Sequence, residues 1–535
     1  MNFGRATVFS LAFLFLLFSV ANGQGSDKRL INQNNANPSR VKDSIMAVRL
    51  PLVQLPQKYR SRSLPSAVDN TQNNYWVGIK DQAMFYTCQQ FSGVAYTFAY
   101  ELNRLRNTPG WYWENSYPPH YTWNFMNQGE RYVGVDFLES FEAIKQQGHM
   151  TSDDYGTDTS TTHLGWISGY DKYYRGMFNH LKQVSAIMTN STEGINTLKN
   201  YLYDHLDGSP VGGIVCFTTS SLSIWQMPVI SAGTPEAGKS IVPFWYDEPN
   251  HGLTIVGYND SIRFDLNNDG QYTNDLDITG DGIVDARDWE FGAFKVANSY
   301  GGWWEDNGYV YAMYRSFALN YEEGGIWNNR VYVVEADTAY NPLLTLKVKM
   351  NYNLRDRIRI MAGVSRDTAS RIPEQVMTFP IFNFQGGEHV MKGWDQVSGA
   401  ESIEFGLDVT QLLNMVPSGA PARYFLAVEE RDPDHIGIGV IQQASFISYV
   451  NGMHEYPVNC ENVSIEDNEV TLVSAVAPVE KPSVQITTNT LPPVQPSQPY
   501  QVQLAAAGGR PPYSWALDEK YNSLQIPDPM PLING

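Results

Sequence analysis

Residues 80–106 read KDQAMFYTCQQFSGVAYTFAYELNRLR. One cysteine, Cys88, stands where a helix is expected to begin. Apolar residues then recur at helical spacing, at Phe91, Val94, Ala95, Phe98, Ala99, Leu102 and Leu105. This i, i+3, i+4, i+7 stripe predicts an amphipathic helix packed on a core. A thiol at the start of such a helix meets the positive end of the helix dipole, which favours the thiolate.

Cys88 alone does not establish chemistry, because a lone cysteine is more often an inert buried side chain. Six residues earlier, Gln82 carries an amide that can donate a hydrogen bond across the turn. The other two cysteines are Cys216, in an apolar run that predicts a buried strand, and Cys460, far away in the sequence. With three cysteines, a disulfide framework does not hold the chain together, and at least one thiol is free.

The overall composition is that of a globular, acidic, multidomain chain. Its 535 residues exceed what one core supports, so we expect about two to four domains. Hydrophobic residues make up 42% and aromatic residues 13% of the chain, so most of it is expected to fold. The net charge of −19 argues against nucleic acid and anionic membrane surfaces as partners.

The N-terminus has the pattern of a secretory signal peptide over residues 1–23. Arg5 supplies the positive charge, Val8–Val20 is almost entirely apolar, and small residues follow at 21–23. The apolar run is too short to cross a bilayer, and no other stretch is a candidate transmembrane segment. We therefore expect a secreted, extracellular protein. Residues 24–63 are polar, then basic, and are interpreted as a prosegment or linker, with a disordered tail as the alternative.

The largest unit is expected over residues 64–336, and it changes character midway. Helical patterns come first, at 137–146 and across 177–206, and strand patterns follow, at 211–218, 251–258, 291–298 and 309–313. Helices followed by strands predict an α+β domain in two lobes, one helical and one built from strands.

An acidic insert, residues 265–288, separates two of these strands. Its second loop matches positions 1, 3, 5, 7, 9 and 12 of a calcium loop at Asp277, Thr279, Asp281, Ile283, Asp285 and Asp288. A first loop starts with Asp265, Asn267 and Asp269 but has Leu276 at its twelfth position. The spacing resembles the paired loops of dockerin modules, and we expect structural Ca²⁺ here. The alternative is an acidic, solvated loop.

The C-terminal part is expected to be all β. Short alternating runs over residues 340–478 predict a β-sandwich. Residues 479–535 combine a proline- and threonine-rich linker with a segment that resembles the first strands of bacterial Ig-like modules. No catalytic cluster is evident in this part, so these β domains are expected to contact a surface or a polymer.

Two residues of the 64–336 unit can complete a site around Cys88. His251 opens one predicted strand and Asn298 closes another. A thiolate nucleophile needs an imidazole, and the imidazole needs a group that orients it. If the two strands pair antiparallel, His251 and Asn298 meet at one end, and the insert 265–288 lies roughly 25 Å away at about 3.3 Å per residue. Calcium in the insert would then be structural, without a part in the chemistry.

Four segments of this unit resemble the papain family of cysteine proteases. Leu64, Pro65, Val68 and Asp69 match the start of the mature family enzymes, and the glutamine–cysteine segment appears as Gln82, Cys88, Phe91 and Ser92. The histidine strand appears at 250–258. The asparagine segment appears as Asn298, Ser299, Tyr300, Gly301, Trp304, Gly308 and Tyr309. The segments occur in the family's order and span most of residues 64–336.

The resemblance implies a role for each site residue. Cys88 is the expected nucleophile, His251 the general acid and base, and Asn298 the residue that orients the imidazole. Gln82 and the Cys88 backbone N–H are expected to form the oxyanion hole, and Trp304 to shield the Asn–His hydrogen bond from water. No cofactor is implied for catalysis.

The sequence departs from the family pattern at several positions. The turn 83–87 is bulky where the family has small residues, Gln89 and Tyr300 stand where the family has tryptophan, and Glu305 replaces a glycine. We therefore expect a secreted papain-like endopeptidase acting on proteins or peptides through a Cys88 thioester. The alternatives are an inactive papain-fold binding protein and an acyltransferase that uses an amine in place of water.

Overall fold

The computed structural model of the chain describes residues 38–156, 165–225, 227–246, 248–393, 402–488, 490 and 504–507. The chain divides into two compact units, Met1–Arg49 and Leu50–Gly535. The described part of the first unit is helix α2, Pro38–Arg49. The expected signal peptide lies outside the described residues. Within the described ranges, no helix combines the length and apolarity needed to span a bilayer.

The helix that carries Cys88 is continuous from Cys88 to Arg106 and runs through the centre of the second unit. It consists of α3 (Cys88–Gln90), a π-helical stretch η3 (Phe91–Phe98) and α4 (Ala99–Arg106). Every residue from Cys88 to Asn103 is buried, so the helix is covered on all sides and is not amphipathic over this length. The predicted apolar stripe is buried except for Leu105, which is 43% exposed.

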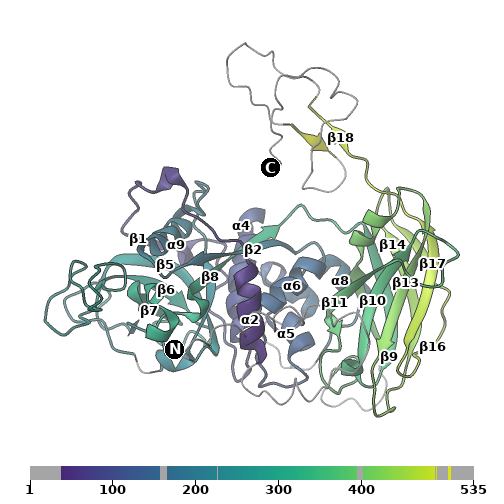
Figure 1. Ribbon diagram of the computed structural model, residues 1–535, viewed down its shortest axis with the longest axis horizontal. Coiled ribbons are helices and arrows are strands. Elements are labelled where there is room, and N and C mark those ends of the chain that lie inside the picture. The colour runs from purple at the N-terminus through teal and green to yellow at the C-terminus, as the bar shows by residue number, and fades with distance from the viewer. Residues whose placement is uncertain are drawn as a thin grey trace, which may run out of the picture. The chain divides into compact units, whose positions relative to one another are not determined.

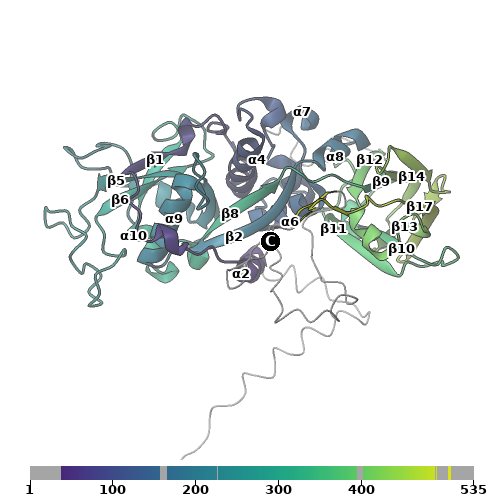
Figure 2. The ribbon, with the colours of Figure 1, turned by 90° about the horizontal axis from the view of Figure 1, so that it is seen from above.

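A second helix of this half, α6 (Phe137–Gln147), follows the prediction closely. The Asp136 carboxylate caps it by accepting a hydrogen bond from the Leu138 N–H at 2.7 Å. Gly148 ends it at φ +70°, where a Cβ atom would meet the Gly176 carbonyl oxygen at 2.2 Å. The helix contacts both strand β2 (His180–Met188) and strand β11 (Gln375–Asn383) (Figure 2).

The strand half of the unit is one eight-stranded sheet. Its strands follow the order β2-β8-β3-β5-β6-β7-β4, and β1 pairs with β5. The bounds not yet given are β1 Ala67–Asp69, β3 Val215–Thr219, β4 Ile241–Val242, β5 His251–Arg263, β6 Phe291–Ala297, β7 Tyr309–Met313 and β8 Arg330–Asp337. Figure 1 shows β5, β6 and β7 side by side. The four strands expected from the sequence correspond to β3, β5, β6 and β7.

One expectation in this half is wrong. The region 177–206 contains strand β2 before its helix α9 (Thr192–Asp204), rather than helix throughout. Strand β2 pairs antiparallel with β8, from His180 opposite Asp337 to Met188 opposite Arg330. Pairing with β8 favours an extended chain here, and α9 begins only where Ser191 caps it, accepting a hydrogen bond from the Gly194 N–H at 3.1 Å.

The β5–β6 hairpin has the predicted antiparallel pairing. Thr254 lies opposite Ala297, and Asn259 lies opposite Ala293. His251 at the start of β5 and Asn298 just after β6 therefore lie at the same end. The insert 265–288 connects the other ends of the two strands.

Residues 340–478 form two antiparallel sheets. One has the order β11-β10-β13-β17, and the other has the order β12-β9-β14-β15 with β16 paired to β14. The bounds not yet given are β9 Leu344–Tyr352, β10 Ile358–Ser365, β12 Ile403–Asp408, β13 Pro421–Glu430, β14 Gly439–Ser448, β15 His454–Pro457, β16 Val463–Ser464 and β17 Val470–Pro478. Of residues 479–535, the structure describes 479–488, 490 and 504–507, in which β18 (Gln485–Ile486) and β19 (Ala506–Ala507) pair antiparallel. The linker and the partial Ig-like domain expected here stay predictions.

The two sheets share a hydrophobic core with the helical half of residues 64–336, within the same compact unit. Phe382 of β11 lies 5.3 Å from Phe125 of helix α5 (His120–Met126) and 5.5 Å from Trp166, measured between ring centroids. The Arg355 guanidinium lies 4.2 Å from the Trp166 ring. The helical half therefore completes its core with residues from the two sheets.

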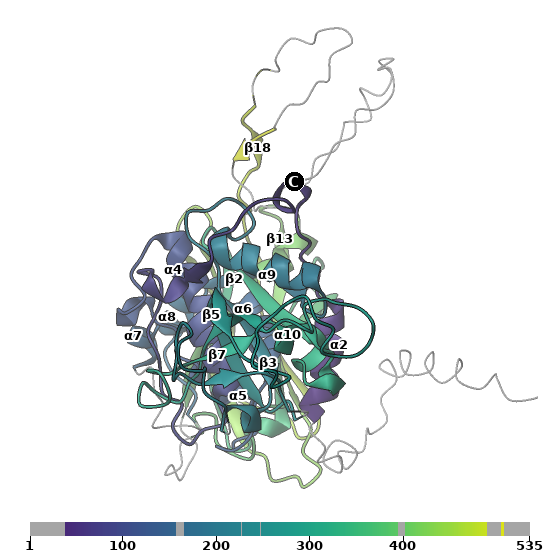
Figure 3. The same ribbon diagram turned by 90° about the vertical axis from the view of Figure 1, so that its left-hand side faces the viewer.

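The chain just before residue 64 lies against the sheet and helix α9. Leu52 forms a parallel bridge with Ala186 of β2, which extends the sheet at its edge. Arg62 forms an ion pair with Asp204 at the end of α9, and it also donates a hydrogen bond to Asn200. Helix α9 itself packs beside strand β2 (Figure 3). The prosegment role expected for residues 24–63 stays a prediction, and residues 24–37 lie outside the described ranges.

Candidate active site

Three elements bring Cys88, His251 and Asn298 together. Cys88 is the first residue of the central helix, His251 is the first residue of β5, and Asn298 follows β6. The Cys88 thiol donates to the carbonyl oxygen of Asn250 across 3.8 Å. The helix approaches this strand so closely that a Cβ atom at Gly252 would lie 2.8 Å from Cα of Gln89. A glycine at this position allows Cys88 to lie beside the histidine strand.

The imidazole has a defined orientation and tautomer. His251 Nε2 lies 2.8 Å from Asn298 Oδ1. The Ser299 backbone N–H donates to the same oxygen at 2.8 Å, which identifies that atom as the amide oxygen. Because an amide oxygen only accepts, Nε2 carries the proton of the neutral ring. Nδ1 is then left as the acceptor, the atom through which the ring can act as a base.

Burial sets the resting charge of the site. Only 7% of Cys88 and 2% of His251 is exposed. Loss of solvation raises the pKa of Cys88 to about 11, against the opposing effect of the Gly252 N–H. Loss of solvation also lowers the pKa of His251 to about 4, against the opposing hydrogen bond to Asn298. The resting pair is therefore a neutral thiol and a neutral imidazole.

Gln82 is held in place by Ser299, the residue that follows Asn298. Its side-chain oxygen accepts a hydrogen bond from the Ser299 hydroxyl at 2.6 Å, and its backbone N–H donates to the Ser299 carbonyl at 2.7 Å. Its amide nitrogen donates to the carbonyl of Phe85 at 2.8 Å, which leaves a second hydrogen on that nitrogen. Cys88, as the first helical residue, has a backbone N–H without an intrahelical acceptor. These two donors are the candidates for an oxyanion hole.

Aromatic rings cover the imidazole. Tyr300 lies 5.0 Å from the His251 ring, and Trp304 lies 5.8 Å from Tyr300 in an edge-to-face contact. Tyr300 is thus the ring that packs on the imidazole, and Trp304, the expected shield, packs on Tyr300. Trp225 stacks on Tyr300 at 5.5 Å.

Sequence reasoning missed the contributions of Asn250 and Trp225. Asn250 supplies its carbonyl to Cys88, and its side-chain oxygen accepts the Ser221 N–H at 2.8 Å. Trp225 stacks on Tyr300, the ring that packs on His251. A backbone carbonyl carries no side-chain signal in a sequence, and a single tryptophan in a loop has no spacing that would identify it.

The insert 265–288 lies at the far end of the hairpin from the triad, and its carboxylates already have partners. Asp277 accepts hydrogen bonds from the N–H groups of Gly280 at 2.7 Å and Gly282 at 2.8 Å. The Arg287 guanidinium forms ion pairs with Asp281 at 2.6 Å and Asp285 at 2.8 Å. Among the residues described, no three histidine, cysteine, aspartate or glutamate side chains are placed to share a metal ion.

Asp288 and Glu290 anchor the two loops from inside. Asp288 is fully buried and accepts the N–H groups of Ile278 at 2.9 Å, Thr279 at 2.8 Å and Asp285 at 3.0 Å. Glu290 accepts the N–H of Leu266, in the first loop, at 2.8 Å. The first-loop residues Asp265, Asn267 and Asp269 bond to one another and to backbone N–H groups. Calcium binding stays a prediction.

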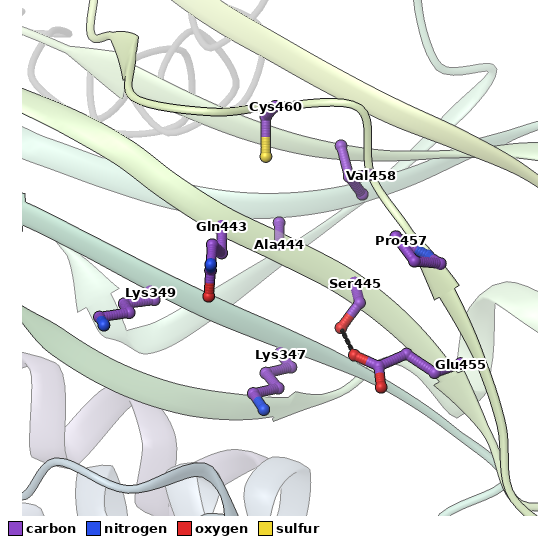
Figure 4. Close-up of a pocket in the computed structure, with 9 residues that line it drawn as sticks. All are labelled: Lys347, Lys349, Gln443, Ala444, Ser445, Glu455, Pro457, Val458 and Cys460. Atoms are coloured by element: carbon purple, nitrogen blue, oxygen red, sulfur yellow. Dashed lines mark hydrogen bonds between the residues drawn. The ribbon is translucent and has the colours of Figure 1, made fainter.

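A pocket of roughly 250 Å³ lies elsewhere, on the sheet that contains β9 and β14 (Figure 4). It is lined by Lys347, Lys349, Gln443, Ala444, Ser445, Glu455, Pro457, Val458 and Cys460. The Ser445 hydroxyl donates to Glu455 at 2.6 Å within it. The pocket contains no member of the triad, so it has no part in the chemistry at Cys88.

Comparisons with known proteins give weak structural similarity. No family model matches the chain, and no curated protein matches it. Procathepsin L 3 of the Tenebrio molitor larval midgut is 14% identical, with a TM-score of 0.34 over 55% of this chain and 78% of that one. Xylellain from Xylella fastidiosa is 14% identical, with a TM-score of 0.36 over 54% and 92%. Bromelain from Ananas comosus is 12% identical, with a TM-score of 0.31 over 51% and 99%. These neighbours are cysteine proteases, but at such scores the assignment depends on the residues of the site.

Proposed function

We propose that the chain is a secreted papain-like cysteine endopeptidase that hydrolyses peptide bonds through a thioester on Cys88. The observation that carries the proposal is the 2.8 Å hydrogen bond from His251 Nε2 to Asn298 Oδ1 beside a cysteine at a helix N-terminus. Nucleophile, base and orienting group come from three separate elements, which is the arrangement that nucleophilic catalysis requires.

Attack on the substrate begins from the neutral pair. His251 Nδ1 takes the proton from the Cys88 thiol as the sulfur attacks the scissile carbonyl carbon, and the imidazolium then gives this proton to the leaving amine. A water molecule, deprotonated by the same nitrogen, attacks the thioester. The carbon–sulfur bond breaks, the acid product leaves, and Cys88 regains its proton. Asn298 holds the ring in the productive tautomer throughout.

The developing oxyanion needs donors aimed at it. The second hydrogen on the Gln82 side-chain nitrogen and the Cys88 backbone N–H are the donors we assign to this role. One such donor is typically worth about 3–4 kcal/mol of transition-state stabilisation. Ser299 fixes the Gln82 side chain, so the donor is held in place before substrate arrives.

Mass spectrometry of the protein during turnover tests this proposal. Unfolded casein serves as a general protein substrate, and a peptide methyl ester serves to accumulate the acyl-enzyme. We expect casein cleavage and a mass increase confined to the peptide that contains Cys88. Cys88→Ala should abolish both, whereas Cys216→Ala, at the other buried thiol, should retain both.

Two results would favour the alternatives. A folded chain that neither cleaves casein nor acquires an acyl group would favour the inactive binding protein. Acylation followed by product formation only when an amine is added would favour the acyltransferase. Cleavage that survives Cys88→Ala would contradict the assignment of the nucleophile.

The proposal extends to the remaining parts of the chain. Residues 1–23 direct export, the insert 265–288 binds structural calcium, and the β-rich part contacts a surface or a polymer. The exposed polar side chains of the pocket in Figure 4, among them Lys349 and Gln443, support the last assignment. Co-sedimentation of the chain with insoluble polysaccharides, compared for the wild type and Lys349→Ala, would test it.

A further inference from the structure

We infer that the pocket across strands β9, β14 and β15 binds a sugar chain that carries carboxylate groups, with Lys349 as the partner of one carboxylate. The inference rests on the proposed function in one respect, because it names the class of polymer that the β-rich part contacts. It does not depend on the chemistry at Cys88. The pocket measures roughly 250 Å³, below the about 300–1,000 Å³ of sites that enclose a whole small ligand, so it suits a single unit of a longer chain.

The pocket is built on the outer face of one sheet. Lys347 and Lys349 alternate with buried apolar residues along β9, so their side chains leave the core. On β14, Gln443 lies opposite Lys349, and Ser445 lies opposite Lys347. Strand β15 brings Glu455 to the other side of β14 (Figure 4). The strand order therefore places the two ammonium groups on one side of the pocket and the carboxylate on the other.

Lys349 is the cation of the pocket that lacks a counterion. It is exposed, and within the described ranges it takes part in no ion pair and donates no side-chain hydrogen bond. Glu404 lies opposite it on β12, but that carboxylate is 3.7 Å from Lys347 and accepts the Tyr170 N–H at 3.0 Å. An ammonium offers three donors, and a carboxylate can accept from it in charge-assisted hydrogen bonds.

Glu455 and Gln443 supply the complementary acceptors. Ser445 is 5% exposed and donates to one Glu455 oxygen at 2.6 Å, which holds the carboxylate in place. The described residues provide no partner for the other oxygen of Glu455 or for the exposed amide of Gln443. Hydroxyl groups donate to such oxygens and accept from such amides. A sugar acid combines these hydroxyls with the carboxylate that Lys349 requires.

The lining also indicates which polymers the pocket does not suit. None of its nine lining residues is aromatic, whereas flat, neutral sugar surfaces are held mainly by stacking on aromatic rings. The net charge of −19 repels an acidic chain from the protein as a whole. At physiological ionic strength that repulsion is screened beyond about 8 Å, so contacts made inside the pocket decide the binding.

Cys460 provides a reporter for occupancy. It lines the pocket and is partly exposed, whereas Cys88 and Cys216 are buried. Iodoacetamide labelling of Cys460 in the intact chain, read by mass spectrometry of its peptide, measures access to the thiol. Burial raises the pKa of Cys460, so the labelling is carried out at mildly alkaline pH, at which carboxylates stay ionised. Oligogalacturonate is compared with a cello-oligosaccharide of the same length, and the dependence of the rate on oligomer concentration gives Kd.

We expect oligogalacturonate to slow the labelling of Cys460 in a saturable manner and the neutral oligomer to leave it unchanged. Lys349→Ala should raise the Kd about tenfold, as loss of one charge-assisted hydrogen bond predicts. Lys349→Arg keeps the charge and should retain most of the affinity. Lys145→Ala is the matched control, because Lys145 is an exposed lysine on α6, outside the pocket, and it should leave the Kd unchanged.

The outcomes separate the inference from the proposed function. Equal protection of Cys460 by both oligomers, or a Kd for oligogalacturonate that Lys349→Ala does not change, would overturn the inference. Protection by the neutral oligomer alone would overturn it and keep the proposed contact with a polymer, whereas protection by neither would overturn both. Casein cleavage is measured on the same preparation, and its absence beside intact protection would overturn the peptidase proposal alone.

Discussion

The Nε2 atom of His251 lies 2.8 Å from the Oδ1 atom of Asn298, which is 47 residues further along the chain. The Ser299 N–H donates to the same oxygen and fixes the rotation of the amide. The orientation of the base therefore depends on one side-chain oxygen with two donors. Removal of that oxygen would leave the imidazole free to change its tautomer.

We accordingly expect Asn298→Ala to lower kcat/KM by at least about tenfold. The upper bound is the full contribution of general acid–base catalysis to the rate, about 10²–10⁴-fold. Asn298→Asp should recover part of the loss, because a carboxylate accepts both hydrogen bonds. It should also raise the pKa of His251, since a negative charge favours the imidazolium. The pH profile of kcat/KM measures this shift. An unchanged profile in Asn298→Asp would mean that the hydrogen bond does not form in solution.

Gln82→Ala should lower kcat by about 10²–10³ if the amide donates to the oxyanion. Ser299→Ala should cause a smaller loss, because it removes the 2.6 Å hydrogen bond that holds the Gln82 side chain but leaves the donor present. Steady-state kinetics on one peptide substrate measure both. A larger loss of kcat in Ser299→Ala than in Gln82→Ala would contradict the assignment of Gln82 as the donor and Ser299 as the residue that positions it.

Acid should destabilise the fold through a buried histidine outside the site. Burial lowers the pKa of His149 to about 4, whereas its Nδ1–H donates to the Met150 carbonyl at 2.7 Å. The unfolded chain binds a proton near pH 6.5 and the folded chain binds it only near pH 4, so stability is lost as the pH falls through this window. The shift corresponds to about 3 kcal/mol.

His149→Asn should flatten this acid dependence. The asparagine amide can still donate to the Met150 carbonyl, but it does not titrate. Urea unfolding between pH 7 and pH 4 gives the free energy of unfolding for both proteins, and His454→Asn, at an exposed histidine, is the control. Parallel curves for His149→Asn and the wild type would assign the acid sensitivity to other groups.

If the insert 265–288 binds calcium, calcium should raise the Tm. At a calcium concentration one hundredfold above Kd, the free energy of unfolding should rise by about 2.7 kcal/mol. Asp277→Ala should remove the response, because Asp277 stands at the first ligand position. Asp288→Ala should lower the Tm even without calcium, because three backbone N–H groups lose their buried acceptor. A Tm that does not respond to calcium or to EDTA would mean that the hydrogen bonds and the Arg287 ion pairs hold the loops of the insert without a metal ion.

Phe382→Ala should destabilise the helical half of the catalytic unit, although Phe382 belongs to the sheet of β11. Its ring packs against Phe125 and Trp166, and truncation of such a ring typically costs about 3–5 kcal/mol. We expect one cooperative unfolding transition at a lower Tm, with activity lost in the same transition. Ile438→Ala, at a side chain that is 74% exposed, should have little effect. Two separate transitions would show that the halves fold independently.

The sequence was sufficient to predict the helix and the hairpin that carry Cys88, His251 and Asn298. The spacing around His251 and Asn298 predicted the hairpin, and the strand pairing has that form. It was not sufficient where long-range contacts decide the conformation. Pairing with β8 makes residues 180–188 a strand, although their surroundings in the sequence favoured a helix. The burial of the Cys88 helix on all sides likewise depends on elements that lie far away in the chain.

The side-chain environment of the site was less predictable than its membership. His251 contacts Asn298, Gln82 contacts Ser299, and the Cys88 thiol donates to the Asn250 carbonyl, but the neutral resting state follows from burial, which a sequence does not report. The family pattern led us to expect Trp304 as the shield, whereas the ring that packs on the imidazole is Tyr300, with Trp304 packed on Tyr300 in turn.

The bridge between Leu52 and Ala186 closes part of an edge of the eight-stranded sheet. Strand β2 lies at the end of the sheet order, so its outer side would offer unpaired backbone groups to any other chain. The Val53 N–H and the Pro51 carbonyl occupy two of these groups at Ala186. A protease that trimmed the chain up to residue 63 would expose this edge and create a site for self-association. Residues 51–53 thus cover part of an edge strand that would otherwise be open to pairing with another chain.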